Sequence, residues 1–126
     1  MKIDRIDHFV LTVADLDATV DFYCRGLGME VVTFGGGRKA LAFGRQKINL
    51  HIKGREIDPK ALRPTAGSGD FCLITEQPLA RWIAHLEREG FAIEEQPCPR
   101  TGATGPITSI YLRDPDGNLV EISTYD

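Results

Sequence analysis

The sequence predicts an α+β fold built from two successive units, each a strand, a helix and three further strands. Three observations carry this prediction: short segments alternate apolar and polar residues, two segments carry apolar residues at helical spacing, and the second half repeats the order of the first. With 126 residues, 42% of them hydrophobic, the chain can bury a real core. We expect one domain, 1–126, with module one at about 1–53, a linker at about 54–69 and module two at about 70–126.

The first unit opens with a strand and a helix. Residues 3–13 are rich in β-branched and apolar side chains, and Asp15 is a suitable N-cap for the helix that follows. Gly28 suits the C-terminal cap of that helix. Its apolar face consists of Val20, Tyr23, Cys24 and Leu27. Three short strands, 29–34, 39–43 and 47–52, complete the unit.

The second unit follows a polar segment, 54–68, which two prolines interrupt. A strand at 70–75 leads to Pro78, which is placed where the first turn of a helix accepts proline. The apolar face of this helix consists of Leu79, Trp82, Ile83 and Leu86. Strands are expected at 92–96, 107–113 and 119–123, the last two joined by a turn at 114–117.

The repeat places four polar residues at matching positions. A shift of 62 positions superposes the two helices and carries His8 onto Asp70. After the longer 98–106 loop of the second unit, a shift of 70 carries His51 onto Glu121. If the inner strands of both units face one cavity, these four side chains converge.

Imidazole and carboxylate ligands together suit a divalent Ni, Zn, Mn, Fe or Co ion. A set of only three or four protein ligands leaves positions open for a substrate, as in a catalytic site. Each residue taken alone also has an ordinary explanation. Asp70, for example, follows Gly-Ser-Gly and can bond to backbone amides nearby.

Composition excludes several classes of partner. The net charge of −3, without a basic run, argues against nucleic acid and anionic membranes and leaves small molecules as the expected ligands. The N-terminal residues resemble no secretory signal, so we expect a cytoplasmic protein. Three cysteines without CxxC spacing argue against a disulfide framework or a cysteine-rich zinc site.

Two longer stretches, "DHFVLTVADLDATVDFYCRGLGMEVV" and "SIYLRDPDGNLVEIS", resemble the vicinal oxygen chelate superfamily, also called the glyoxalase/bleomycin-resistance/dioxygenase group. Within it the sequence is most similar to the glyoxalase domain-containing protein 5 family. The resemblance implies a curved mixed sheet in which each module forms a half-barrel, helices outside, a metal in the cup and a homodimer. It implies that the metal slots are His8, His51, Asp70 and Glu121, and that Glu121 helps to move a proton.

The resemblance favours a metal-dependent, glyoxalase-like lyase or isomerase that acts on a small bidentate oxygen substrate, including a thiol adduct of a ketoaldehyde. An extradiol-type ring-cleavage dioxygenase is the first alternative. Asp70, in place of the histidine common there, weakens it, whereas Tyr111 supports it because related dioxygenases place a tyrosine on the preceding strand. A non-enzymatic protein that sequesters a small molecule or drug is the second alternative.

Further residues are candidates for contact with a substrate. Arg100 opens a glycine-rich segment, 100–105, in which backbone N–H groups can approach an anion, although a solvent-exposed loop fits the same pattern. Lys47 and Asn49 share a strand face with His51 and are expected to reach the same ligand. Glu121 and Tyr111 are the candidate catalytic residues.

Overall fold

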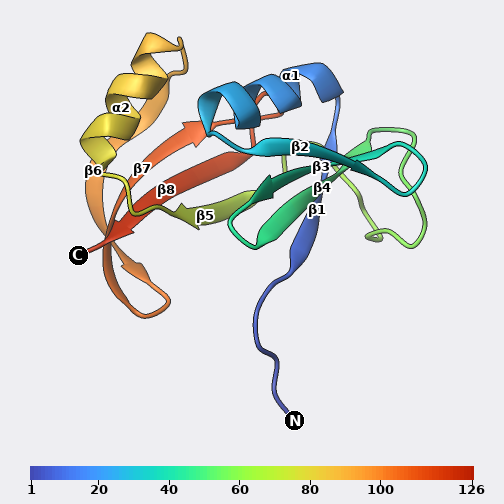
Figure 1. Cartoon of the computed structure of the whole chain (residues 1–126), viewed down its shortest axis with the longest axis horizontal. Helices are drawn as coiled ribbons and strands as arrows, with labels where there is room; N and C mark the ends of the chain where they lie inside the picture. Colours follow the sequence, from blue (N-terminus) through green and yellow to red (C-terminus); the bar gives the residue numbers. More distant parts are fainter. The chain divides into compact units, whose positions relative to one another are not determined.

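The computed structural model describes all residues 1–126 and divides them into two compact units, 1–67 and 68–126. Each unit contains one mixed four-stranded sheet and its own helical segment, coloured blue to green in the first unit and olive to red in the second (Figure 1). The predicted α+β class with two strand–helix–three-strand units is confirmed. Residues 54–67 count with the first unit.

The first sheet has the strand order β1-β4-β3-β2. Its elements are β1 (His8–Val13), α1 (Leu16–Asp21), the π-helical turn η1 (Phe22–Gly26), β2 (Glu30–Phe34), β3 (Arg38–Phe43) and β4 (Gln46–Ile52). Strand β1 pairs with β4 in parallel, and the other pairs are antiparallel. Asp15 caps α1 as predicted, because its Oδ1 accepts a hydrogen bond of 3.0 Å from the Ala18 N–H.

The second sheet repeats this plan in the order β5-β8-β7-β6. Its elements are β5 (Asp70–Ile74), α2 (Leu79–Arg88), β6 (Ile93–Gly102), β7 (Gly105–Arg113) and β8 (Leu119–Tyr125). Strand β5 pairs with β8 in parallel, as β1 pairs with β4. Neither helix of the chain has the length and apolar character needed to cross a lipid bilayer.

Two expected boundaries are wrong. The first strand begins at His8 rather than at residue 3. The expected 98–106 loop is mostly strand, because β6 and β7 form a long hairpin in which Gly102 pairs with Gly105. Two prolines fit within β6 because it is an edge strand, where one side of the backbone needs no ladder hydrogen bond.

The pairing registers decide which side chains share a face of each sheet, because directly paired residues point the same way. In the first unit, Leu11 pairs with Leu50, and Leu41 pairs with Ile48, which puts these buried side chains on one face. The other face carries His51. The same logic builds the site in the second unit.

Candidate active site

The second unit contains a pocket of about 360 Å³ on one face of its sheet. All four strands contribute to it, and the β6–β7 hairpin forms part of its wall. The lining residues are Cys72, Ile74, Arg100, Thr101, Gly102, Ala103, Ile107, Tyr111, Glu121 and Tyr125. The structure thus brings together three residues that the sequence singled out, Arg100, Tyr111 and Glu121.

The strand registers explain why these side chains meet. Glu121 on β8 pairs directly with Tyr111 on β7 and with Cys72 on β5, so the three residues form one row across the sheet. Paired residues in adjacent strands have neighbouring side chains. Arg100 reaches this row from β6, where its Nε donates a hydrogen bond of 3.0 Å to the Tyr111 hydroxyl oxygen.

Two serines on the same face of the sheet hold the Glu121 carboxylate. Ser109 Oγ donates a hydrogen bond of 2.6 Å to Glu121 Oε2, and Ser123 Oγ lies 3.3 Å from the same oxygen. The two serine oxygens are 2.6 Å apart, and both side chains are fully buried. These contacts hold the carboxylate of Glu121 in one orientation at the pocket.

Tyr111 remains a neutral hydroxyl over a wide pH range. Burial raises the pKa of Tyr111 above its usual value near 10, and the neighbouring Glu121 carboxylate adds to the rise, whereas the hydrogen bond from Arg100 opposes it. The guanidinium carbon of Arg100 also lies 5.4 Å from the centroid of the Tyr111 ring. The pocket therefore combines a carboxylate, a protonated phenol and a fixed cation.

Cys72 is also in the pocket, but its thiol is not set up as a nucleophile. Its Sγ lies 3.2 Å from Ser123 Oγ. Burial raises the pKa of the Cys72 thiol, which favours the unreactive protonated form at neutral pH.

The other sequence-predicted site residues lie elsewhere. Asp70 is exposed, pairs with Leu119 and does not line the pocket. His8 is on β1, and its Nδ1 is 2.8 Å from Asp7 Oδ1. The Lys47 Nζ lies 3.8 Å from the centroid of the Phe34 ring, so the ammonium group of Lys47 makes a cation–π contact with this ring.

The pairing of the strands corrects the predicted match between the residues of β4 and those of β8. In the first unit His8 pairs with Lys47, and in the second unit Asp70 pairs with Leu119. If His8 and Asp70 are counterparts, the shift for the last strands is 72 rather than 70. The counterpart of Glu121 is then Asn49, and His51 corresponds to Ser123.

Asn49 is buried, with an exposed fraction of 5%, and its Oδ1 has no hydrogen-bond partner. Buried polar atoms are nearly always bonded, so this oxygen needs an explanation. It occupies the position that corresponds to Glu121 in the second unit.

A divalent metal at a catalytic site needs about three protein donors. Neither unit by itself brings three or more His, Cys, Asp or Glu side chains together. His8 and His51 are separated by four positions along the paired strands, roughly 13 Å at the rise of a β-strand. The residues of a single unit therefore do not fit a catalytic metal centre.

Sequence reasoning missed Ser109, Ser123 and Tyr125. Serine and tyrosine are ordinary residues in strands, so nothing in the local sequence marks these three as part of a site. Only the register of β7 against β8 shows that Ser109 and Ser123 meet beneath Glu121.

Comparisons with known proteins agree with this architecture. The chain is 57% identical over 125 residues to the virulence protein STM3117 of Salmonella typhimurium, which covers 99% of this chain and 87% of that protein. The crystal structure of that protein superposes with a TM-score of 0.98 at 56% identity and full coverage of both chains. The glyoxalase domain-containing protein RDO1 of Mycosarcoma maydis is 54% identical over 125 residues, covering 99% of this chain and 70% of that protein.

A more distant structure carries a specific enzyme name. The lactoylglutathione lyase of Agrobacterium tumefaciens has a TM-score of 0.74 at 26% identity, with 98% of this chain and 95% of that chain covered. The model of the glyoxalase/bleomycin resistance protein/dioxygenase superfamily matches residues 5–122. Since that match spans nearly the whole chain, and two relatives exceed half identity along it, the chain belongs to the glyoxalase/bleomycin resistance protein/dioxygenase superfamily.

Proposed function

We propose that this protein is a glyoxalase-type lyase or isomerase that binds a small carbonyl substrate in the pocket of its second unit. The observation that carries the proposal is the meeting of Glu121, Tyr111 and Arg100 in one pocket of about 360 Å³. A base, a hydroxyl donor and a cation are the groups that proton transfer next to a carbonyl requires.

The reaction follows from these groups. The Glu121 carboxylate takes a proton from the carbon beside the carbonyl, and the electron pair of that C–H bond moves onto the carbonyl oxygen. The Tyr111 hydroxyl and the Arg100 guanidinium stabilise the resulting oxyanion. Protonated Glu121 then gives its proton to the former carbonyl carbon, and the adjacent hydroxyl-bearing carbon becomes the new carbonyl. The proton of that hydroxyl passes to the oxyanion, so the substrate is isomerised with no net change in protons.

The substrate class is inferred from the similarity to a lactoylglutathione lyase. The lactoylglutathione lyase of Agrobacterium tumefaciens shares the fold and 26% of the sequence. We propose a thiol adduct of a ketoaldehyde as the substrate, because such an adduct has adjacent oxygens and a transferable proton on carbon.

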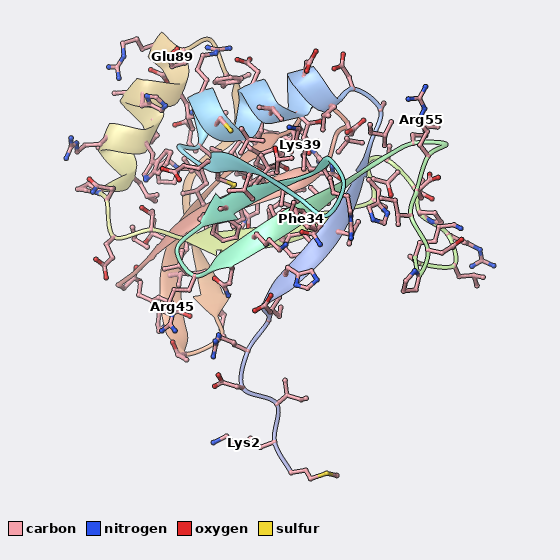
Figure 2. All side chains as sticks on the ribbon, turned by 45° about the vertical axis from the view of Figure 1, so that its right-hand side comes forward. Lys2, Phe34, Lys39, Arg45, Arg55 and Glu89 are labelled. Carbon is pink, nitrogen blue, oxygen red and sulfur yellow. The ribbon has the colours of Figure 1, made fainter.

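The test is the kinetics of Glu121→Gln with ketoaldehyde–thiol adducts. Gln keeps the shape but cannot take a proton, so we expect kcat to fall by about 10²–10⁴-fold with little change in KM. Glu89→Gln, at the C-cap of α2 and outside the pocket lining, is the matched control for loss of one charge (Figure 2). Full activity of Glu121→Gln would sink the proposal.

The same assay separates the two alternatives. A ring-cleavage dioxygenase consumes oxygen when given a catechol and needs no thiol. A sequestering protein binds its ligand tightly and turns over neither substrate. Catechol-dependent oxygen uptake, or binding without turnover, would replace the lyase assignment.

A requirement for a divalent metal stays a prediction from the family resemblance. His8 and Glu121 are the best individual candidates for ligands: the Nδ1 of His8 is bonded to a carboxylate, an arrangement that leaves Nε2 available and is common in metal-binding histidines. Metal analysis of the purified protein should show a lower content for His8→Ala and for Glu121→Ala. Unchanged content in both variants would remove these residues as ligands.

We also propose a homodimer. Strand β1 is an edge strand that exposes Val10 at 44%, and the chain leading into it exposes Ile3 and Ile6 at 90% and 67%. Burial of such side chains against a second copy is favourable. Light scattering should give a dimer for the native protein and a larger monomer fraction for Ile6→Asp. A native monomer would contradict the proposal.

A further inference from the structure

A second pocket, of about 180 Å³, lies in the first unit at the end of the sheet where β3 begins and β4 ends. The polar groups around it come from three places. They are Gly36 and Gly37 of the β2–β3 turn, Arg38 and Lys39 at the start of β3, His51 at the end of β4, and Arg55 in the segment after β4.

This pocket is rich in positive charge. No acidic side chain forms an ion pair with Arg38, Lys39 or Arg55. Lys39 pairs with Leu50 and so points to the sheet face opposite His51, where its Nζ donates a hydrogen bond of 2.6 Å to Thr33 Oγ1. The Arg38 guanidinium carbon lies 4.8 Å from the centroid of the Phe34 ring. The guanidinium of Arg55 has no hydrogen-bond partner within the chain and projects from the segment after β4 (Figure 2).

Glu56 is the acid nearest to His51, and the chain already uses its carboxylate. Its Oε1 accepts a hydrogen bond of 3.0 Å from the Gly54 N–H. Hydrogen bonds from backbone N–H groups, its own first, lower the pKa of Glu56, with smaller contributions from Lys60 and His51. On the side of His51, two cations, Arg38 and Arg55, against one bonded carboxylate leave the pocket with a net positive charge.

His51 is the buried member of this set. Its exposed fraction is 4%, it lines the pocket, and its ring forms no hydrogen bond with another group of the chain. A buried polar side chain without a protein partner points to a ligand as its partner. The neighbouring cations disfavour a second positive ion at this position, so the predicted role of His51 as a metal ligand conflicts with its surroundings.

The turn adds backbone donors. Gly36 and Gly37 have φ of +80° and +93°, and a Cβ on either would meet nothing within 4 Å. Their N–H groups donate no hydrogen bond within the chain. Backbone N–H groups of glycines in a turn can bind an anion closely, because no side chain blocks the approach.

We propose that this pocket binds a phosphate group, either free or as the monoester of a small molecule. Donors from a turn, two strand ends and the following segment approach from several directions, which suits a tetrahedral dianion with four oxygens better than a planar carboxylate. The first unit as a whole supports it, since residues 1–67 carry eleven Lys and Arg against eight Asp and Glu. The inference does not depend on the lyase assignment, because the two pockets lie in different units.

Titration calorimetry of the full chain with inorganic phosphate tests the proposal, with sodium chloride at equal ionic strength as the reference. We expect saturable binding that weakens at least tenfold in Arg55→Ala and in His51→Leu. Arg45→Ala removes the same charge from the β3–β4 turn, at the other end of β3 and β4, and should leave the affinity unchanged (Figure 2).

The ligands that bind identify the chemical group that the pocket recognises. Binding of both phosphate and methyl phosphate identifies the phosphate group, and binding of inorganic phosphate alone identifies the free ion. Acetate binding of equal strength, no saturable binding, or an equal loss in Arg45→Ala would overturn the proposal. Arg55→Lys separates charge from folding: it should retain part of the affinity, and circular dichroism should show the native fold for every variant. Activity with ketoaldehyde adducts is measured separately, so failure of the lyase assignment leaves this result intact.

Discussion

At the scale of single residues, Asn49 has the least expected environment. Its Oδ1 is buried and unbonded, on the sheet face that also carries His51. A buried polar atom without a partner costs about 1–3 kcal/mol, whereas an apolar group of the same shape does not. The native chain thus gives up stability at this position, as sites for ligands often do.

Replacement of Asn49 by leucine should therefore stabilise the protein. We expect the free energy of unfolding to rise by about 1 kcal/mol in Asn49→Leu, measured by urea denaturation without added ligand. Asn49→Asp is the opposing control, since it buries a charge and should destabilise the fold. A loss of stability in Asn49→Leu would mean that the side chain is satisfied in the folded protein.

A second prediction at this scale concerns Cys72. Its pKa is raised above the usual value near 9, mainly by burial and further by the Glu121 charge. A raised pKa keeps the thiol protonated, so alkylation should be slow at pH 7–8 and should accelerate only above pH 9. Mass spectrometry after timed iodoacetamide treatment measures this rate, with free cysteine as the reference thiol. In Glu121→Gln the onset should shift to lower pH, and fast alkylation at pH 7 in the native chain would contradict the prediction.

The repeat singled out Glu121, the family resemblance singled out Tyr111 and the glycine-rich segment singled out Arg100, and the structure places all three around one pocket. The sequence was not sufficient to match His51 with its counterpart. The shifts of 70 and 72 both keep every side chain on the same face, since the strand period is two. Only the strand pairing shows that the turn before the last strand differs in length between the units. Five residues lie between Arg113 and Leu119, whereas two lie between Phe43 and Gln46.

At the scale of elements, the β6–β7 hairpin is the main departure from expectation. Its prolines and glycines are typical of loops, and no local pattern indicates that an edge strand will accept them. The strands with regular alternation, such as β4 and β8, were predicted to within two residues. Local periodicity therefore locates the central strands, and tertiary pairing decides the edge.

Gly102 in this hairpin is required for space rather than for its backbone angles. A Cβ there would lie 2.8 Å from the Tyr125 hydroxyl oxygen and 2.9 Å from Ile107 Cγ2. We expect Gly102→Ala to lower the free energy of unfolding by about 1–3 kcal/mol, measured by urea denaturation, and to narrow the pocket. In a Tyr125→Phe background the loss should be smaller because the closest atom is absent. No change in stability in Gly102→Ala would show that the hairpin adapts.

At the scale of the whole molecule, the two units share a topology but differ in charge. The second unit, 68–126, carries four arginines, no lysine and ten Asp and Glu, whereas the first has an excess of three positive charges. The chain total of −3 hides this difference. The duplicated fold thus supports two electrostatic environments, one for each pocket.

This difference predicts unusual behaviour on ion exchangers. At pH 7 and about 10 mM salt, where charges act over roughly 30 Å, the protein should be retained on an anion exchanger through its second unit and on a cation exchanger through its first. Elution volume in a salt gradient measures both. Lys53→Gln should elute earlier from the cation exchanger only. Passage through the cation exchanger without delay would contradict the prediction.

The tip of the β6–β7 hairpin gives this fold an adjustable wall. Gly102 and Gly105 close the ladder, so Ala103 and Thr104 are the only residues beyond it, and Ala103 borders the pocket. Residues inserted at this tip would deepen or cap the pocket while every strand keeps its register. The length of this hairpin can therefore change the shape of the pocket while Cys72, Glu121 and Tyr111 keep their pairing.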